Sequence, residues 1–296
     1  MFESLFSKPT TADLLKVIMK EPFNESTANS MLETVDINSI DNDGKSLLHH
    51  ACSDNISEPI KWLIKNGINK ELEDYYDDSA LMLAIQNDSF KSFNVLLESG
   101  YDVDKRNRNG RTILQDSLLY DDLKFFNKIL NYTKNIDNID KDGRNVLFDA
   151  VHNVNLEIIR DLLSKDITKD LIDKNGKPAF LLEQVINDFN LLKLLVDNGI
   201  DVSVKDKDGN NVLYYVLKSE SINTDIIDYA ITNKIDVNSV NLLGNTVLIE
   251  MIYTLSEQKN KFNTDVQKEK KMINTIDKLI DHGIDINTEN NKGQTA

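Results

Sequence analysis

Apolar residues recur along the chain in pairs of short segments, and each pair follows a polar turn that contains a glycine. One pair is SLLHHAC followed by EPIKWLIKN, in which Ile60, Leu63 and Ile64 recur at helical spacing. A second glycine follows the second segment, as in LLESGYDVD and LIDHGIDIN, where it can end a helix. The pattern predicts a unit of turn, helix, short loop, helix and extended return.

The turn glycines are regularly spaced. Gly110, Gly143, Gly176 and Gly209 follow one another at steps of 33 residues, and Gly44 lies 66 residues before Gly110. In the unit between them, YDDSALMLA, we assign Asp78 to the glycine's place, because Asp tolerates the left-handed conformation better than most residues. A repeat of this length predicts a stacked array instead of one globular core.

These units resemble the ankyrin repeat family. The 33-residue step, the D-x-x-G turn, Ser46-Leu47-Leu48-His49 in place of the family's Thr-Pro-Leu-His, and second halves such as LIDHGIDIN carry the resemblance. It implies an all-α solenoid of stacked helix-turn-helix units with short β-turn or hairpin loops. We predict that residues 1–42 form a degenerate capping repeat and residues 43–291 form seven repeats. The seventh has an insertion at about 256–271, and residues 292–296 open an eighth unit.

In the second helix of several repeats, aromatic residues occupy positions of the repeating apolar pattern, and we expect them to lie in the core. These are Trp62, Phe93, Phe125 and Phe126. Leu63 and Leu96 are placed in the seams between repeats.

Composition narrows the classes of partner. The formal net charge is −15, with a pI near 4.7, which disfavours nucleic-acid or anionic-membrane binding. Cys52 is the only cysteine, so a reducing compartment fits best. The first residues do not have the pattern of a signal peptide. We therefore expect a monomeric, cytoplasmic protein, and delivery into a host cell as an effector stays open as an alternative.

Candidate chemistry is sparse. His49 and Cys52 share a helical face, but a structural zinc site needs four ligands, so His49 is interpreted as the residue that braces the turn. Residues 138–149 resemble the calcium-binding loop of an EF-hand. The same Asp- and Gly-containing turn recurs in other repeats that lack the remaining ligands of such a loop, so we attribute the match to the repeat pattern. Common nucleotide-binding and hydrolase motifs are absent from the sequence. We predict no enzyme, no metal and no cofactor.

The family resemblance implies a concave binding face formed by the turns and first helices. On this face we place a row of mainly basic residues, together with aromatic residues in an early repeat and two leucines in the seventh. We predict that it binds a partner protein, through an acidic segment of that protein, as a scaffold or adaptor. The alternative is an effector or regulatory module whose activity lies in a partner or beyond residue 296. The predicted partner-binding residues are Tyr75, Tyr76, Arg106, Arg108, Arg111, Tyr120, Lys141, Arg144, Lys174, Lys177, Leu242 and Leu243.

Overall fold

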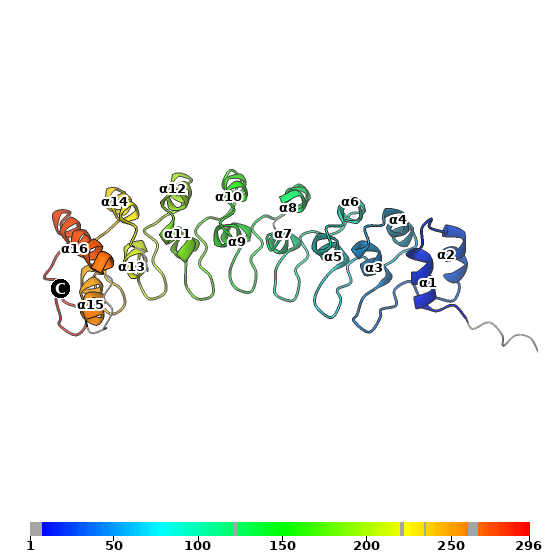
Figure 1. Ribbon diagram of the computed structural model, residues 1–296, viewed down its shortest axis with the longest axis horizontal. Helices are drawn as coiled ribbons and strands as arrows, with labels where there is room; N and C mark the ends of the chain where they lie inside the picture. Colours follow the sequence, from blue (N-terminus) through cyan, green and yellow to red (C-terminus); the bar gives the residue numbers. More distant parts are fainter. Residues whose placement is uncertain (1–7, 121–122, 220–221, 234, 260–265) are drawn as a thin grey trace, which may run out of the picture. The chain divides into compact units, whose positions relative to one another are not determined.

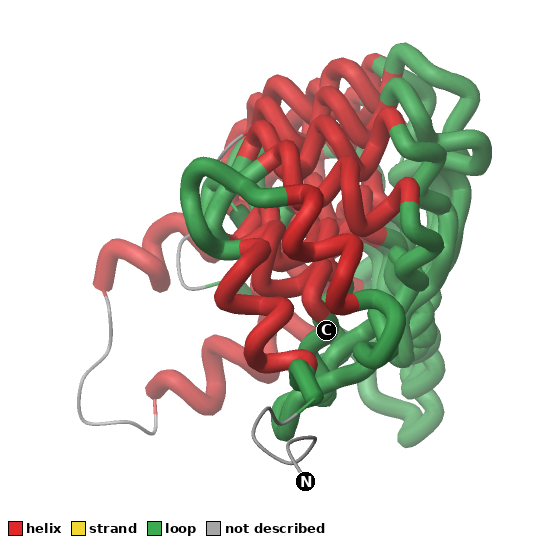
Figure 2. The backbone as a smooth tube through the Cα atoms, turned by 90° about the vertical axis from the view of Figure 1, so that its right-hand side faces the viewer, coloured by secondary structure: helices red, strands yellow, loops and turns green. Residues whose placement is uncertain are grey.

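A computed structural model describes residues 8–120, 123–219, 222–233, 235–259 and 266–296. The chain divides into two compact units, Met1–Asp140 and Lys141–Ala296. The described residues form helices joined by turns and loops, with isolated antiparallel bridges across several turns (Figures 1 and 2). The predicted all-α solenoid with short hairpin loops is therefore confirmed. None of the described helices is long and apolar enough to cross a membrane.

The first unit contains four pairs of antiparallel helices. First helices pack on first helices and second helices on second helices, as the contacts of α3 with α5 and of α4 with α6 show (Figure 1). The pairs are α1 (Thr11–Ile18) with α2 (Glu25–Met31), α3 (Leu47–Ser53) with α4 (Ser57–Lys65), α5 (Ala80–Gln86) with α6 (Phe90–Glu98), and α7 (Ile113–Ser117) with α8 (Leu123–Leu130).

The second unit repeats the same arrangement, and its last pair is longer. Residues 256–259 of the predicted insertion continue α15, residues 266–271 begin α16, and residues 260–265 lie outside the described residues. The elements are α9 (Val146–His152), α10 (Leu156–Leu163), the 3-10 helix η1 (Ala179–Leu181), α11 (Glu183–Asn187), α12 (Phe189–Asp197), α13 (Val212–Lys218), α14 (Thr224–Thr232), α15 (Val247–Lys259) and α16 (Val266–Asp281).

Most first helices start at a small polar residue that caps them. Ser79 accepts the backbone N–H of Met82 at 3.1 Å, and Asn145 accepts that of Phe148 at 3.0 Å, which satisfies donors that the helix leaves unpaired. Pro178 occupies the same place before η1 and has no side-chain oxygen. That first helix accordingly begins as a 3-10 turn and is interrupted at Leu182 before α11.

The predicted core residues are buried. Phe93, Phe125 and Phe126 are at most 1% exposed, and Trp62 is 3% exposed. The rings of Phe93 and Phe125, from consecutive second helices, meet edge to face at 4.8 Å between centroids. Leu63 and Leu96 are fully buried, as expected.

His49 braces its turn and also contacts the next repeat. Its Nδ1 accepts the backbone N–H of Ser46 at 3.1 Å and lies 2.7 Å from the Ser46 hydroxyl, while its Nε2 lies 3.2 Å from the carbonyl oxygen of Asp78. In the neutral imidazole, Nδ1 can accept from Ser46 while an N–H on Nε2 donates to the Asp78 carbonyl. Both ring nitrogens then have a hydrogen-bond partner. The interpretation of His49 as the brace of the turn is confirmed.

One loop between paired helices is strained. Asn55, Asp88 and Val154 occupy equivalent places and have φ angles of 58°, 53° and 55°. Asn and Asp adopt this left-handed conformation readily, whereas a β-branched residue does not.

We predict that Val154→Asn raises the free energy of unfolding by about 1 kcal/mol, because it removes a left-handed penalty of about 1–2 kcal/mol. Urea unfolding would measure the gain. Val154→Ala keeps the Cβ atom and is the matched control, with a smaller gain. A loss of stability in the Asn variant would contradict the assigned strain.

His49 predicts a pH dependence of stability. Burial lowers the pKa of His49 below its ordinary value of 6.5, against a raising contribution from the hydrogen bond to Asp78. The unfolded chain therefore binds a proton more readily than the native one as pH falls below about 6.5, and the stability contributed by neutral His49 is lost there. Urea unfolding between pH 7.5 and 5.5 should show this loss, and His49→Gln should flatten the slope. An unchanged slope would contradict the prediction.

Candidate protein-binding face

From Asp41 onward, each repeat opens with a turn whose first residue, the opening residue, is an Asp or Asn. The Oδ1 of this residue accepts the backbone N–H groups two and four residues later at Asp41, Asp74, Asn107, Asp173, Asp206, Asn241 and Asn290. At Asp206 these hydrogen bonds are 2.9 Å to Asp208 and 2.7 Å to Asn210. We call the two residues after the opening residue the tip, and the fourth residue after it the closing residue. The opening residues are Asp41, Asp74, Asn107, Asp140, Asp173, Asp206, Asn241 and Asn290.

The left-handed residue of each turn lies between the tip and the closing residue. In the second repeat this residue is Asp77, with φ of 69°, so the assignment of Asp78 to the glycine's place is wrong by one residue. Asp78 is the closing residue, whose N–H donates to Asp74 Oδ1 at 3.1 Å. The error arose because two consecutive aspartates follow the tip and either tolerates the turn.

Consecutive turns are also joined through their backbones. The N–H of Tyr75 donates to the carbonyl of Asp43 at 2.9 Å, and that of Leu242 donates to Asp208 at 2.8 Å. The approach is close, since a Cβ atom on Gly244 would lie 2.7 Å from the backbone nitrogen of Asn291. The tips that begin at Tyr75 and Leu242 are therefore held by their own turn and by a neighbouring turn.

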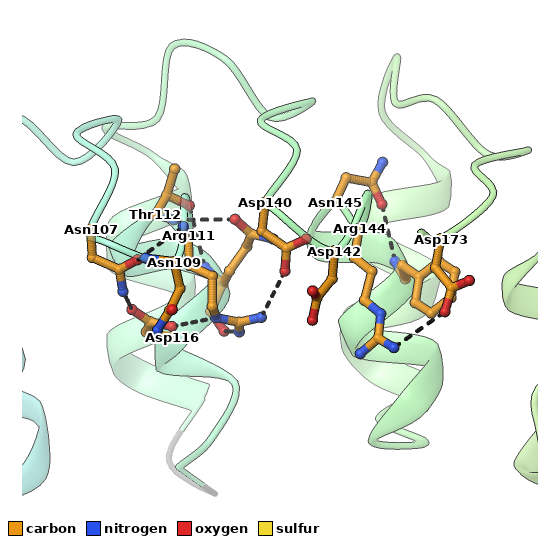
Figure 3. A network of polar contacts seen from close by, with 12 residues as sticks. Asn107, Asn109, Arg111, Thr112, Asp116, Asp140, Asp142, Arg144, Asn145 and Asp173 are labelled. Atoms are coloured by element: carbon orange, nitrogen blue, oxygen red, sulfur yellow. Dashed lines mark hydrogen bonds and ion pairs between the residues drawn. The ribbon is translucent and has the colours of Figure 1, made fainter. Parts of the chain in front are cut away.

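Three predicted partner-binding residues are closing residues, and they hold the repeats together. The Arg111 guanidinium pairs with Asp116 at 2.6 Å and with Asp140, the opening residue of the next turn, at 3.3 Å (Figure 3). It also donates to the carbonyl of Gln115 at 3.0 Å. Only 19% of the Arg111 side chain is exposed. The side chain of Arg111, which was predicted to bind a partner, is therefore mostly buried and engaged within the chain.

The same contact recurs in the second unit. Arg144 pairs with the opening residue Asp173 at 3.3 Å (Figure 3) and lies 5.1 Å from the centre of the Phe148 ring. Lys177 lies 4.5 Å above the Tyr215 ring. Burial lowers the pKa of Lys177, although Asp173 and Asp206 act to raise it.

Further along the second unit, amides replace these charges. Asn241 donates to the closing residue Asn210 at 3.2 Å, and Asn290 donates to Asn245 at 2.9 Å. We call the contact between a closing residue and the next opening residue the turn staple.

The other predicted basic residues are more accessible. Arg108 pairs with Asp77 at 2.6 Å while 65% of its side chain stays exposed, and Lys174 pairs with Asp142 at 2.5 Å. Arg106 is exposed and donates to Asn138 at 3.1 Å. Lys141 is exposed. Tyr120 is half-buried, and burial raises the pKa of its hydroxyl.

Two tips present large apolar side chains to solvent. Tyr75 and Tyr76 are 62% and 72% exposed in the first unit, and Leu242 and Leu243 are 69% and 63% exposed in the second. These four residues, which were predicted to bind a partner, are therefore accessible from solvent.

A groove of about 480 Å³ lies beside the second of these tips. It is formed by α13, α15 and the turns that begin at Asn241 and Asn290. Neither its tyrosines nor Glu250 was predicted as a site residue. Its lining residues are Tyr214, Lys218, Leu243, Asn245, Glu250, Tyr253, Thr254, Asn290, Asn291 and Lys292.

The polar groups of the groove are largely committed to one another. Glu250, only 12% exposed, accepts from Asn245 at 2.7 Å and from Asn241 at 3.2 Å, and lies 3.7 Å from the ammonium of Lys218. Lys218 donates to the Tyr214 hydroxyl at 2.7 Å. Burial acts to lower the pKa of Lys218, but Tyr214 and Glu250 outweigh it, so that pKa is raised.

Other candidate chemistry is weak. Cys52 is fully buried, and burial raises the pKa of its thiol, so it is a packing residue with little thiolate character. Among the described residues, no group of three or more His, Cys, Asp or Glu side chains is placed to hold a metal ion.

Comparisons with known proteins agree with this architecture. Family models described as ankyrin repeats match residues 14–107 and residues 187–231. The crystal structure of the ankyrin repeat domain of Bcl-3, a member of the IkappaB protein family, is similar with a TM-score of 0.62 and 18% sequence identity. That similarity covers 71% of this chain and 95% of the Bcl-3 chain. No curated protein sequence matches this chain.

The turn staple predicts unequal effects of two neighbouring arginines. Arg111→Met should lower the free energy of unfolding by about 3 kcal/mol, because it removes a shared partner of two largely buried carboxylates. The matched Arg108→Met should cost less than about 1 kcal/mol, because its ion pair is exposed. Urea unfolding of both variants measures the difference. Equal effects would show that the Arg111 pairs contribute no more than a surface contact.

Proposed function

We propose that this chain, which is an ankyrin repeat protein, is a non-enzymatic scaffold or adaptor that binds a partner protein through its turns and first helices. Ankyrin repeats are in general protein–protein interaction modules. The finer proposal is that the tips make the principal contacts.

The exposure of the apolar tips is the observation that supports this proposal. Tyr76 and Leu242 are each more than two-thirds exposed, although their turns are fixed by side-chain and inter-turn hydrogen bonds. A large apolar side chain on a rigid backbone loses little conformational entropy on binding. Such residues commonly dominate the energy of protein interfaces.

We also propose that the partner contributes an acidic segment. Arg106, Arg108 and Lys141 keep exposed side chains after their contacts within the chain are considered. Arg can bind a carboxylate through two parallel hydrogen bonds. Arg111, Arg144 and Lys177 are engaged in or beside turn staples. We therefore propose that they position the tips and do not themselves contact the partner protein. A cytoplasmic location remains part of this proposal.

Site-specific photocrosslinking tests the proposed face. A photoreactive phenylalanine analogue at Tyr76 or Leu242 should form covalent adducts with the same set of partner proteins in a lysate of the source cells. The analogue at Lys61, exposed on the second helix α4, is the matched control and should form none of them. Adducts from position 61 alone would place the interface on the second helices.

Replacing Tyr76 and Leu242 together provides a second test of the proposed face. The double variant Tyr76→Ser and Leu242→Ser should lose capture of the crosslinked partner by at least tenfold. Its melting temperature should stay within about 2 °C of wild type, because substitutions at exposed sites rarely change stability by more than about 0.5 kcal/mol. Unchanged capture would refute the role of the tips.

A further inference from the structure

We propose that the groove between α13 and α15 in the second unit binds one large apolar side chain of an acidic segment of a partner protein, and that Leu243 is its contact residue. This inference rests on the proposed protein-binding function. It adds the chemistry of the bound segment and the position of the pocket.

The two leucines of the tip differ in their relation to the groove. Leu242 and Leu243 have similar exposures of 69% and 63%, so composition and accessibility do not distinguish them. Only Leu243 is among the residues that line the groove. The contact in the groove is therefore assigned to Leu243.

Two tyrosine rings in the lining of the groove favour an apolar group. The Tyr253 hydroxyl donates to Gln294 at 2.6 Å and accepts from Asn290 at 3.2 Å, while the Tyr214 hydroxyl accepts from Lys218. Both hydroxyls are thus engaged within the chain. The part of these side chains left for a ligand is mainly ring surface, which binds apolar and aromatic groups.

The charge left for a ligand is positive. Glu250 is the acidic residue of the lining, and its carboxylate is covered and held by two amides and Lys218. By contrast, 49% of the Lys218 side chain is exposed, and Lys292, which also lines the groove, is exposed. Carboxylates beside the inserted side chain would find these ammonium groups, whereas a basic segment would be repelled.

The volume also fits a side chain. A space of about 480 Å³ lies within the range of about 300–1,000 Å³ that ligand pockets occupy. A leucine or phenylalanine with its neighbouring backbone would occupy it.

Fluorescence anisotropy with synthetic peptides tests the inference. The probe is a fluorescein-labelled nine-residue peptide with phenylalanine between glutamates. Its controls replace phenylalanine by alanine, or all glutamates by lysines. The full chain should bind the first peptide at least tenfold more tightly than either control, and binding should weaken as salt rises through screening. Equal binding of the alanine peptide would overturn the apolar pocket, and equal binding of the lysine peptide would overturn its charge preference.

The variants localise the contact. Leu243→Asp should weaken binding of the phenylalanine peptide at least tenfold. Ile286→Asp, at an exposed apolar position outside the lining, should weaken it less than twofold, with unchanged circular dichroism for both variants. Lys292→Glu should weaken binding more than Lys205→Glu, because Lys205 lies outside the lining. Equal losses for Leu243→Asp and Ile286→Asp would overturn the assignment of Leu243.

Failure here is distinguishable from failure of the proposed function. If the tips crosslink a partner but no peptide binds at millimolar concentration, the scaffold function stands and the pocket assignment falls. If a single-stranded oligothymidine binds with the same dependence on Leu243, the groove is a general anion site and the inference is overturned.

Discussion

The turn staple is the side-chain contact that anchors the turns of Asp140, Asp173, Asn241 and Asn290 to the turns before them. A closing residue reaches the opening residue of the next turn, and that opening residue in turn fixes its own loop by accepting two backbone N–H groups. One side chain therefore organises a turn and also anchors it to its neighbour. Packing of helix on helix supplies most of the buried apolar surface, and the staples together with the backbone hydrogen bonds between turns hold neighbouring turns to one another.

The staple also explains how a chain of net charge −15 carries a row of bases along its turns. Arg111 and Arg144 neutralise opening aspartates that are only 4% exposed, and leaving such carboxylates unpaired would be costly. Beyond Lys177 the staples become pairs of amides. An amide carries both a donor and an acceptor, so these contacts need no counter-charge, and they are less sensitive to salt than the arginine pairs.

Periodicity was enough to predict the fold, the core aromatic residues and the exposed tips, because these follow from position within one repeat. It was not enough to separate Arg111 from Arg108, since that distinction depends on what the next repeat presents. A signal existed in the sequence. Arg111 and Asp140, and likewise Arg144 and Asp173, are 29 residues apart, so opposite charges recur at a fixed offset. The groove has no comparable signal, because Tyr214 and Tyr253 come to line one groove only through the packing of two different repeats.

The separation of tip from staple within a five-residue turn bears on how such a protein can change over evolutionary time. The tip side chains contribute little to the turn's own hydrogen bonds, which use the backbone of those positions and the side chain of the opening residue. Tyr-Tyr, Arg-Asn and Leu-Leu all occupy the same backbone geometry. Natural variation can therefore replace the two tip residues, which we propose as recognition residues, with the architecture preserved. Under that proposal a lineage acquires a new partner without first having to recover a lost fold.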